Sequence, residues 1–123
     1  MAKNILIVDD SKTIRQHVGL TLTNQGFGVV EAEDGLVALS QLEKHENIEM
    51  IISDVNMPRM DGLEMIEKIR QNSRFKFIPI IMLTTESSGD KVKRAKLAGA
   101  SGWLLKPFNS EQLLSAVKRL VRQ

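Results

Sequence analysis

Short apolar segments alternate with segments of helical spacing along the whole chain, and this alternation restricts the possible folds more than any other feature. The apolar segments are unbroken and rich in β-branched residues, as in parallel strands that are covered on both faces. They lie at residues 5–8, 29–30, 50–52, 80–83 and 103–105. Each of them predicts a short buried strand.

Apolar residues between and after these strands recur three or four positions apart, which is typical of helices that bury one face. The sets are Ile14, Val18 and Leu22; Leu36, Leu39 and Leu42; Leu63, Ile66 and Ile69; Val92, Ala95 and Ala98; and Leu113, Val117, Leu120 and Val121. The chain therefore predicts an α/β fold of the (βα)5 type: one five-stranded parallel sheet with right-handed crossovers and helices on both faces.

The ends of the predicted helices carry matching signals. Ser11, Asp61 and either Asn109 or Ser110 are suited to cap helix starts, and Gly26 and Gly99 follow helices where a left-handed residue is expected. The helix over residues 88–98 is the weakest, because its anchors are small and its other positions are rich in lysine. We expect this helix to be the one that moves or makes contacts.

Length and composition fit one cytoplasmic domain. The chain has 123 residues, no cysteine, 42% hydrophobic and 26% charged residues, and no apolar run of about 20 residues that would span a membrane. Residues 1–61 carry 5 basic and 10 acidic side chains, whereas residues 62–123 carry 12 and 5. Because no aromatic residues alternate with the lysines and no recognition motif is present, we expect no nucleic-acid partner.

Polar residues follow four of the five predicted strands. Asp9 and Asp10 follow the first strand, Asp54 the third, Thr84 and Thr85 the fourth, and Lys106 the fifth. Ligands of open parallel sheets bind at the carboxyl ends of the strands, so these side chains are expected to converge on one rim.

Three clustered carboxylates need positive charge nearby, because like charges at about 4 Å repel by roughly 4 kcal/mol at an effective dielectric near 20. Lys106 supplies one positive charge, and an Mg²⁺ ion suits a site of oxygen ligands without histidine or cysteine. We expect Asp10, Asp54 and the backbone carbonyl of Asn56 to ligate it, with Asp9 as a ligand or as the acceptor of a metal-bound water. Asp54 is central and can act as a nucleophile that forms an aspartyl phosphate. Lys106 would pair with the phosphate.

The segments ILIVDDS, IISDVNMPRMDG, IIMLTTE and GWLLKPF, in this order and spacing, resemble the receiver domain of response regulators over essentially the whole chain. The resemblance is strongest to the single-domain, CheY-like members of two-component and chemotaxis signalling. It implies a flavodoxin-like sheet of order 2-1-3-4-5. It also implies a receiver over residues 1–123 without an output domain, and a monomer that is a signalling module and not an enzyme.

The resemblance implies roles for individual residues. Asp54 is expected to accept a phosphoryl group from a histidine kinase, Asp9 and Asp10 to hold Mg²⁺, and Thr84 and Lys106 to read the phosphoryl group. It also implies that the Lys106–Pro107 bond is cis. A downstream protein target, such as a flagellar motor switch, would bind the face formed by the fourth helix, the fifth strand and the fifth helix.

Four further residues are predicted to tune the switch. Trp103 occupies the family's aromatic switch position, where Tyr or Phe is more common, and Thr85 adds bulk where the family often has alanine. Asn56 and Glu86 flank the path of the attacking water, which predicts a short-lived phosphoryl group. On phosphorylation, Thr84 is expected to move inward and the helix over 88–98 to be re-aimed.

Other interpretations of these residues remain open at this point. Asp9 and Asp10 can be helix caps, Asp54 a turn residue, Trp103 an ordinary half-buried strand residue and the lysines of 91–96 a solvated face. An Mg²⁺-dependent phosphatase also uses an aspartate nucleophile on a parallel sheet, although usually on the first strand in a D-x-D pattern. The GFG of residues 26–28 could belong to a dinucleotide site, and the chain could be a receiver that only docks partners.

Overall fold

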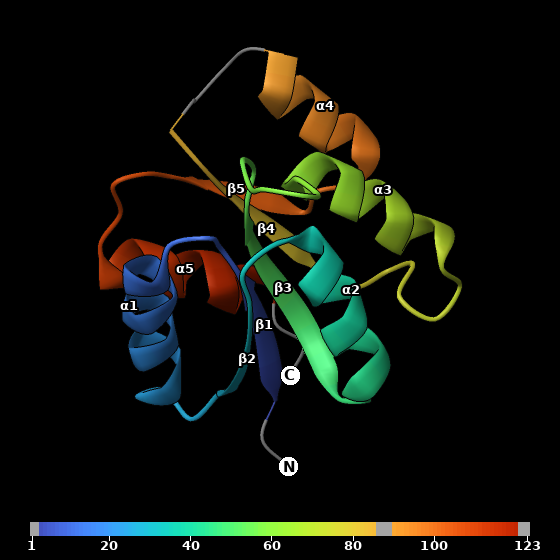
Figure 1. The fold of residues 1–123 in the computed structure, drawn as a ribbon. Helices are drawn as coiled ribbons and strands as arrows, with labels where there is room; N and C mark the ends of the chain where they lie inside the picture. The colour runs from blue at the N-terminus through green and yellow to red at the C-terminus, as the bar shows by residue number, and fades with distance from the viewer. Residues whose placement is uncertain (1–2, 86–89, 121–123) are drawn as a thin grey trace.

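The computed structural model describes residues 3–85 and 90–120, and in them five strands alternate with five helices. Figure 1 shows a central sheet with helices on both sides. The elements are β1 (Asn4–Val8), α1 (Lys12–Thr23), β2 (Gly28–Ala32), α2 (Gly35–Lys44), β3 (Ile48–Asp54), α3 (Gly62–Gln71), β4 (Ile80–Thr84), α4 (Asp90–Ala98), β5 (Gly102–Leu105) and α5 (Ser110–Leu120).

All neighbouring strands are parallel, and their order is β2-β1-β3-β4-β5. The α/β fold class, the five-stranded sheet and its order are therefore confirmed. Helices α1 and α5 cover one face of the sheet, and α2, α3 and α4 cover the other (Figure 1). This arrangement buries the central strands β1, β3 and β4 on both sides, which is why their apolar segments show no alternation, whereas the edge strands β2 and β5 are only partly buried.

Two apolar cores result, one on each face of the sheet. Along β1, Ile5 and Ile7 lie in the core beneath α1 and α5, whereas Leu6 and Val8 lie in the core beneath α2, α3 and α4. The same period of two holds on β3, where Ile52 lies in the α1 and α5 core. Whether a side chain at a strand end faces one core or the other therefore depends on whether it lies an odd or an even number of positions from a residue of known face.

The predicted helix ends are confirmed. The side chains of Ser11, Asp61 and Asn109 each accept a backbone N–H of the first turn, and for the last helix this decides between Asn109 and Ser110. Gly26 and Gly99 have φ of 88° and 110°, in the left-handed region where glycine is favoured. The Lys106–Pro107 bond is cis, as the resemblance implied.

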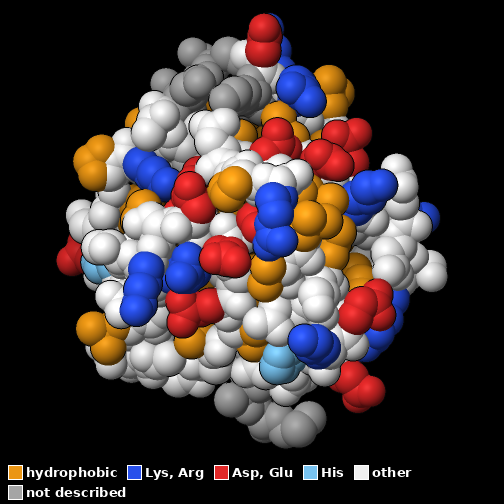
Figure 2. All heavy atoms as spheres, in the orientation of Figure 1, with side chains coloured by type: hydrophobic (Ala, Val, Ile, Leu, Met, Phe, Trp, Pro, Cys, Tyr) orange, Lys and Arg blue, Asp and Glu red, His pale blue; other side chains and the backbone are white. Residues whose placement is uncertain are grey.

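Helix α4 has the small apolar face that the sequence predicts, with Val92 and Ala95 buried. Its described part begins at Asp90, and residues 88–89, like Val121 of the last helix, lie outside the described residues. Figure 2 shows basic and acidic side chains interspersed on the face seen in Figure 1. Within residues 3–85 and 90–120, no helix is both long and apolar enough to cross a membrane.

Candidate functional site

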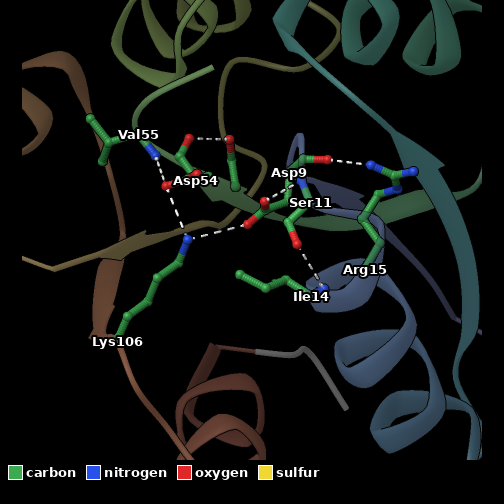
Figure 3. A network of polar contacts seen from close by, with 8 residues as sticks. Asp9, Ser11, Ile14, Arg15, Asp54, Val55 and Lys106 are labelled. Atoms are coloured by element: carbon green, nitrogen blue, oxygen red, sulfur yellow. Dashed lines mark hydrogen bonds and ion pairs between the residues drawn. The ribbon is translucent and has the colours of Figure 1, made fainter. Parts of the chain in front are cut away.

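The predicted rim residues Asp9, Asp54 and Lys106 come together at the carboxyl ends of β1, β3 and β5. The Nζ atom of Lys106 lies 3.4 Å from Oδ2 of Asp9 and 3.4 Å from Oδ1 of Asp54 (Figure 3). The three residues follow Ile7, Ile52 and Leu104 by two positions, and those residues all contribute to the α1 and α5 side. The period of two thus turns all three side chains toward the same side of the rim.

Hydrogen bonds with backbone groups hold each of these three residues in place. Oδ1 of Asp54 accepts the N–H of Val55 at 2.8 Å, and Oδ1 of Asp9 accepts the N–H of Ser11 at 2.9 Å. The backbone N–H of Lys106 donates to the carbonyl of Thr84 at 2.7 Å, which fixes where the lysine leaves the sheet. The site is therefore formed by residues that end, or directly follow, four strands of the sheet.

Asp9 is the buried member of the cluster, with an exposed fraction of 0%. Burial raises the pKa of Asp9 above its ordinary value, and the charge of Asp54 acts in the same direction, against the N–H of Ser11 and the ammonium of Lys106. The raised pKa means that Lys106 does not fully compensate the negative charge of Asp9.

The carboxylates of Asp9, Asp10 and Asp54 fit a divalent cation. Each offers one oxygen, and these oxygens lie within 4.8 Å of one another, with Asp9 buried, Asp10 exposed and Asp54 between the two. Hard oxygen ligands with one exposed member suit Mg²⁺, which keeps part of its water shell. Asn56 lies two residues beyond Asp54 on the exposed side of the loop that leaves β3.

The interpretation of Asp9 and Asp10 as caps of the first helix is wrong. Ser11 is the N-cap of α1, and Asp9 accepts the N–H of Ser11 in the turn that precedes the helix. Asp54 is the last residue of β3, the position expected of a receiver. The phosphatase pattern would instead place the nucleophile on the first strand. In the GFG segment Gly26 precedes β2 and Gly28 is its first residue, so the glycines lead into a strand instead of following one and do not form a dinucleotide-binding turn.

The predicted switch residues lie on the other side of the sheet. Thr84 is buried and follows Met82 by two positions, and Met82 belongs to the core beneath α2, α3 and α4. Trp103 is half-buried against that same core, with Nζ of Lys96 from α4 at 4.4 Å from its ring centroid. Thr85 is exposed. Glu86 lies outside the described residues.

Sequence reasoning missed two charged residues around the site, Arg15 and Asp34. The Arg15 guanidinium donates to the backbone carbonyl of Asp9 and pairs with Glu31 at 3.0 Å, which ties α1 to the ends of β1 and β2. Asp34 is buried and caps α2 by accepting the N–H of Val37 at 3.0 Å. An aspartate directly before a helical apolar pattern is a cap signal, so the cap of α2 was predictable.

Comparison with known proteins agrees with this geometry. Residues 5–118 match the family model of the response regulator receiver domain. The chain belongs to the response regulator receiver family. It is a CheY-like receiver: it is 43% identical over 110 residues to the chemotaxis protein CheY1 of Helicobacter pylori, with 89% of each chain covered. Receivers of this kind are signalling proteins.

Solved structures support the same assignment. The chemotaxis response regulator CheY4 of Vibrio cholerae superposes on this receiver with a TM-score of 0.93 and 47% identity, covering 98% of this chain and 100% of that one. The receiver domain of the sensor histidine kinase PA1611 of Pseudomonas aeruginosa superposes with a TM-score of 0.88 and 26% identity, covering 98% of each chain. That structure has a magnesium ion coordinated in its active-site cleft.

Proposed function

We propose that this receiver takes a phosphoryl group onto Asp54 from the phosphohistidine of a histidine kinase, in the presence of Mg²⁺, and thereby changes its affinity for a protein target. The observation that carries the proposal is the position of Lys106, whose Nζ lies at the same 3.4 Å from Asp9 and from Asp54. One lysine between clustered carboxylates leaves negative charge uncompensated, which favours binding of a cation.

The chemistry assigned to this chain is a single phosphoryl transfer. An oxygen of the Asp54 carboxylate attacks phosphorus and forms an O–P bond, the P–N bond to the donor imidazole breaks, and the imidazole nitrogen keeps its electron pair. Oδ1 of Asp54 is already oriented by Val55 and Lys106, so little rearrangement is needed for attack. Lys106 and the hydroxyl of Thr84 would then bind phosphoryl oxygens.

Asp9, Asp10, Asp54 and the carbonyl of Asn56 would hold the Mg²⁺ ion. When bound, the ion supplies positive charge beside the phosphoryl oxygens as negative charge crowds there. Asp9 is shielded from solvent, so its carboxylate contributes charge in a place where water screens it little.

The proposed switch runs from the rim to α4. Phosphorylation adds negative charge next to Lys106, the buried Thr84 moves toward it, and α4 shifts because Val92 and Ala95 anchor it with little apolar surface. Trp103 and Lys96 link this helix to β5. The surface of α4, β5 and α5 would thus change its affinity for the target, for which a flagellar motor switch is our first candidate because relatives are chemotaxis proteins.

The lifetime of the phosphoryl group is assigned to the two residues predicted to flank its water path. Asn56 lies on the exposed loop after β3, where an amide can orient water toward Asp54. A short lifetime that lengthens when Asn56 and Glu86 are both replaced by larger apolar residues supports this role, and an unchanged lifetime contradicts it.

Mass spectrometry after treatment with a small-molecule phosphodonor tests the proposal. With Mg²⁺ the wild-type chain is expected to gain the mass of one phosphoryl group, and the Asp54→Asn variant none. An equal gain in Asp54→Asn, or no gain in wild type, contradicts the proposal. Release of many phosphates per chain from a phosphate ester would favour the phosphatase instead.

A further inference from the structure

Asp34 is a buried carboxylate outside the rim, and it contacts the loop that follows the phosphoacceptor strand. Its exposed fraction is 1%, and its Oδ2 lies 2.6 Å from Nη2 and 2.7 Å from Nε of Arg59. Burial acts to raise the pKa of Asp34, but the N–H of Val37 and the Arg59 guanidinium outweigh it and hold the pKa below its ordinary value. Asp34 is therefore a charged anchor for an arginine 25 positions further along the chain.

Arg59 needs such an anchor because of its backbone. Its φ is 62°, and among the described residues it is the one non-glycine residue with a positive φ. The left-handed conformation brings Cβ close to the following carbonyl and is disfavoured for residues other than glycine. A two-point contact with a buried carboxylate offsets this cost.

The first residue of α2 also contacts the next residue of the loop. The N–H of Gly35 donates to the carbonyl of Met60 at 3.0 Å. A Cβ at Gly35 would lie 2.7 Å from Cγ of Met60, so only glycine allows this approach without a shift. Asp34 and Gly35 thus bind residues 59 and 60 of the loop together.

The loop between β3 and α3 carries Asn56. At its far end the N–H of Gly62 donates to the carbonyl of Val55 at 2.8 Å, which closes residues 55–62 into a compact turn. With that end closed and residues 59 and 60 bound to Asp34 and Gly35 at the start of α2, the backbone at Asn56 is restrained on both sides.

We propose that Asp34 is a positioning residue for Mg²⁺ binding: by holding Arg59 in its left-handed conformation, it fixes the loop that presents the Asn56 carbonyl to the metal. This inference rests on the proposed function, since it takes Asn56 as a ligand. Asp34 itself touches neither metal nor phosphate and acts only through the loop.

Isothermal titration calorimetry with Mg²⁺ tests the inference on four variants. Asp34→Asn keeps a side-chain oxygen for the Val37 N–H but loses the buried charge 2.6 Å from Arg59, leaving only the exposed Glu33 at 3.9 Å. Its Mg²⁺ affinity is expected to fall on the order of tenfold. Arg59→Ala removes the contacts with Asp34 but still has a Cβ that disfavours the positive φ of residue 59. It is expected to weaken Mg²⁺ binding by about fivefold. Arg59→Gly loses the same contacts but adopts a positive φ freely, so it is expected to bind nearly as wild type.

The matched control is Glu43→Gln, which removes one charge from the exposed Arg74–Glu43 ion pair at 3.8 Å and is expected to leave Mg²⁺ affinity unchanged. Hydrogen exchange supplies a readout without metal: the Gly35 amide, bound to Met60, should exchange faster in Asp34→Asn and in Arg59→Ala but not in Arg59→Gly.

Any one of three results overturns the inference. These are an Mg²⁺ affinity of Asp34→Asn equal to that of wild type, equal Mg²⁺ affinities of Arg59→Ala and Arg59→Gly, or a loss of Mg²⁺ affinity in Glu43→Gln as large as that in Asp34→Asn. If Asp34→Asn does not fold, the comparison of the two Arg59 variants decides. Failure of the proposed function looks different, because then the wild-type chain itself binds no Mg²⁺ or gains no phosphoryl mass on Asp54.

Discussion

Replacing the buried carboxylate of Asp9 by an amide is expected to stabilise the metal-free protein. The Asp9→Asn change removes the attraction to Lys106 across 3.4 Å, about 5 kcal/mol at an effective dielectric near 20. It also removes the repulsion from Asp54, whose oxygen lies within 4.8 Å and contributes at least about 3.5 kcal/mol on the same scale.

Two further effects favour the amide. Asp10 repels Asp9 from a similar distance, although its exposure to water weakens that repulsion, and a fully buried carboxylate costs dehydration that an amide largely avoids. Lys106 keeps its other partner, Asp54, at 3.4 Å. We therefore expect a net gain of about 1–2 kcal/mol in the free energy of unfolding, or roughly 4–8 °C in Tm.

The pH dependence gives this prediction its sign. The pKa of Asp9 is raised in the folded state, so the ionised carboxylate destabilises the fold at neutral pH, and the folded state binds the proton more readily than the unfolded one. Stability from this group falls as pH rises from the ordinary value of 3.8 through the folded-state pKa and is constant above it. The advantage of Asp9→Asn should accordingly shrink as the pH is lowered toward 3.8.

Urea denaturation at pH 7 in EDTA, repeated at lower pH and with excess Mg²⁺, measures these effects. Magnesium should stabilise wild type more than Asp9→Asn, because ligand binding to the folded state adds RT ln(1 + [Mg²⁺]/Kd). Asp10→Asn serves as a control, with a smaller gain expected at an exposed carboxylate. If Asp9→Asn is less stable than wild type in EDTA at pH 7, the electrostatic reasoning is refuted.

Two predictions concern the parts that support the site. Gly62→Ala places a Cβ against the carbonyl of Asp54 and 2.7 Å from Cε of Met82, and thermal denaturation should show a loss of about 3 kcal/mol; an unchanged Tm would contradict the crowding. Arg70→Met removes a guanidinium that donates to the Gly99 carbonyl at 2.7 Å and to the loop before β4, and it should cost about 2–3 kcal/mol. Hydrogen exchange should then quicken at the carboxyl end of α4, and protection equal to wild type would argue against this anchor.

Much of the candidate site was predictable because it depends on the fold class alone. Any βα chain brings the carboxyl ends of its strands to one rim, so aspartates after β1 and β3 and a lysine after β5 meet there whatever the details of the loops. The spacing alone did not predict on which face of the sheet each rim residue lies. Side chains alternate between the faces along a strand, so the face is known only once one residue of the strand has been assigned to one of the two cores. Thr84 and Trp103 lie on the face of α4 for this reason.

The sequence by itself determined the number and type of the elements, the parallel sheet, most helix caps and the composition of the rim. These features depend on burial and hydrogen bonding within a few residues, which hydrophobic periodicity and cap residues report directly. Only the tertiary structure decided that Asp34 binds Arg59 and that Arg70 binds Gly99, 25 and 29 positions apart. Such pairs form only where two segments distant in the sequence bring a donor and an acceptor within about 3 Å, and no local pattern encodes that distance.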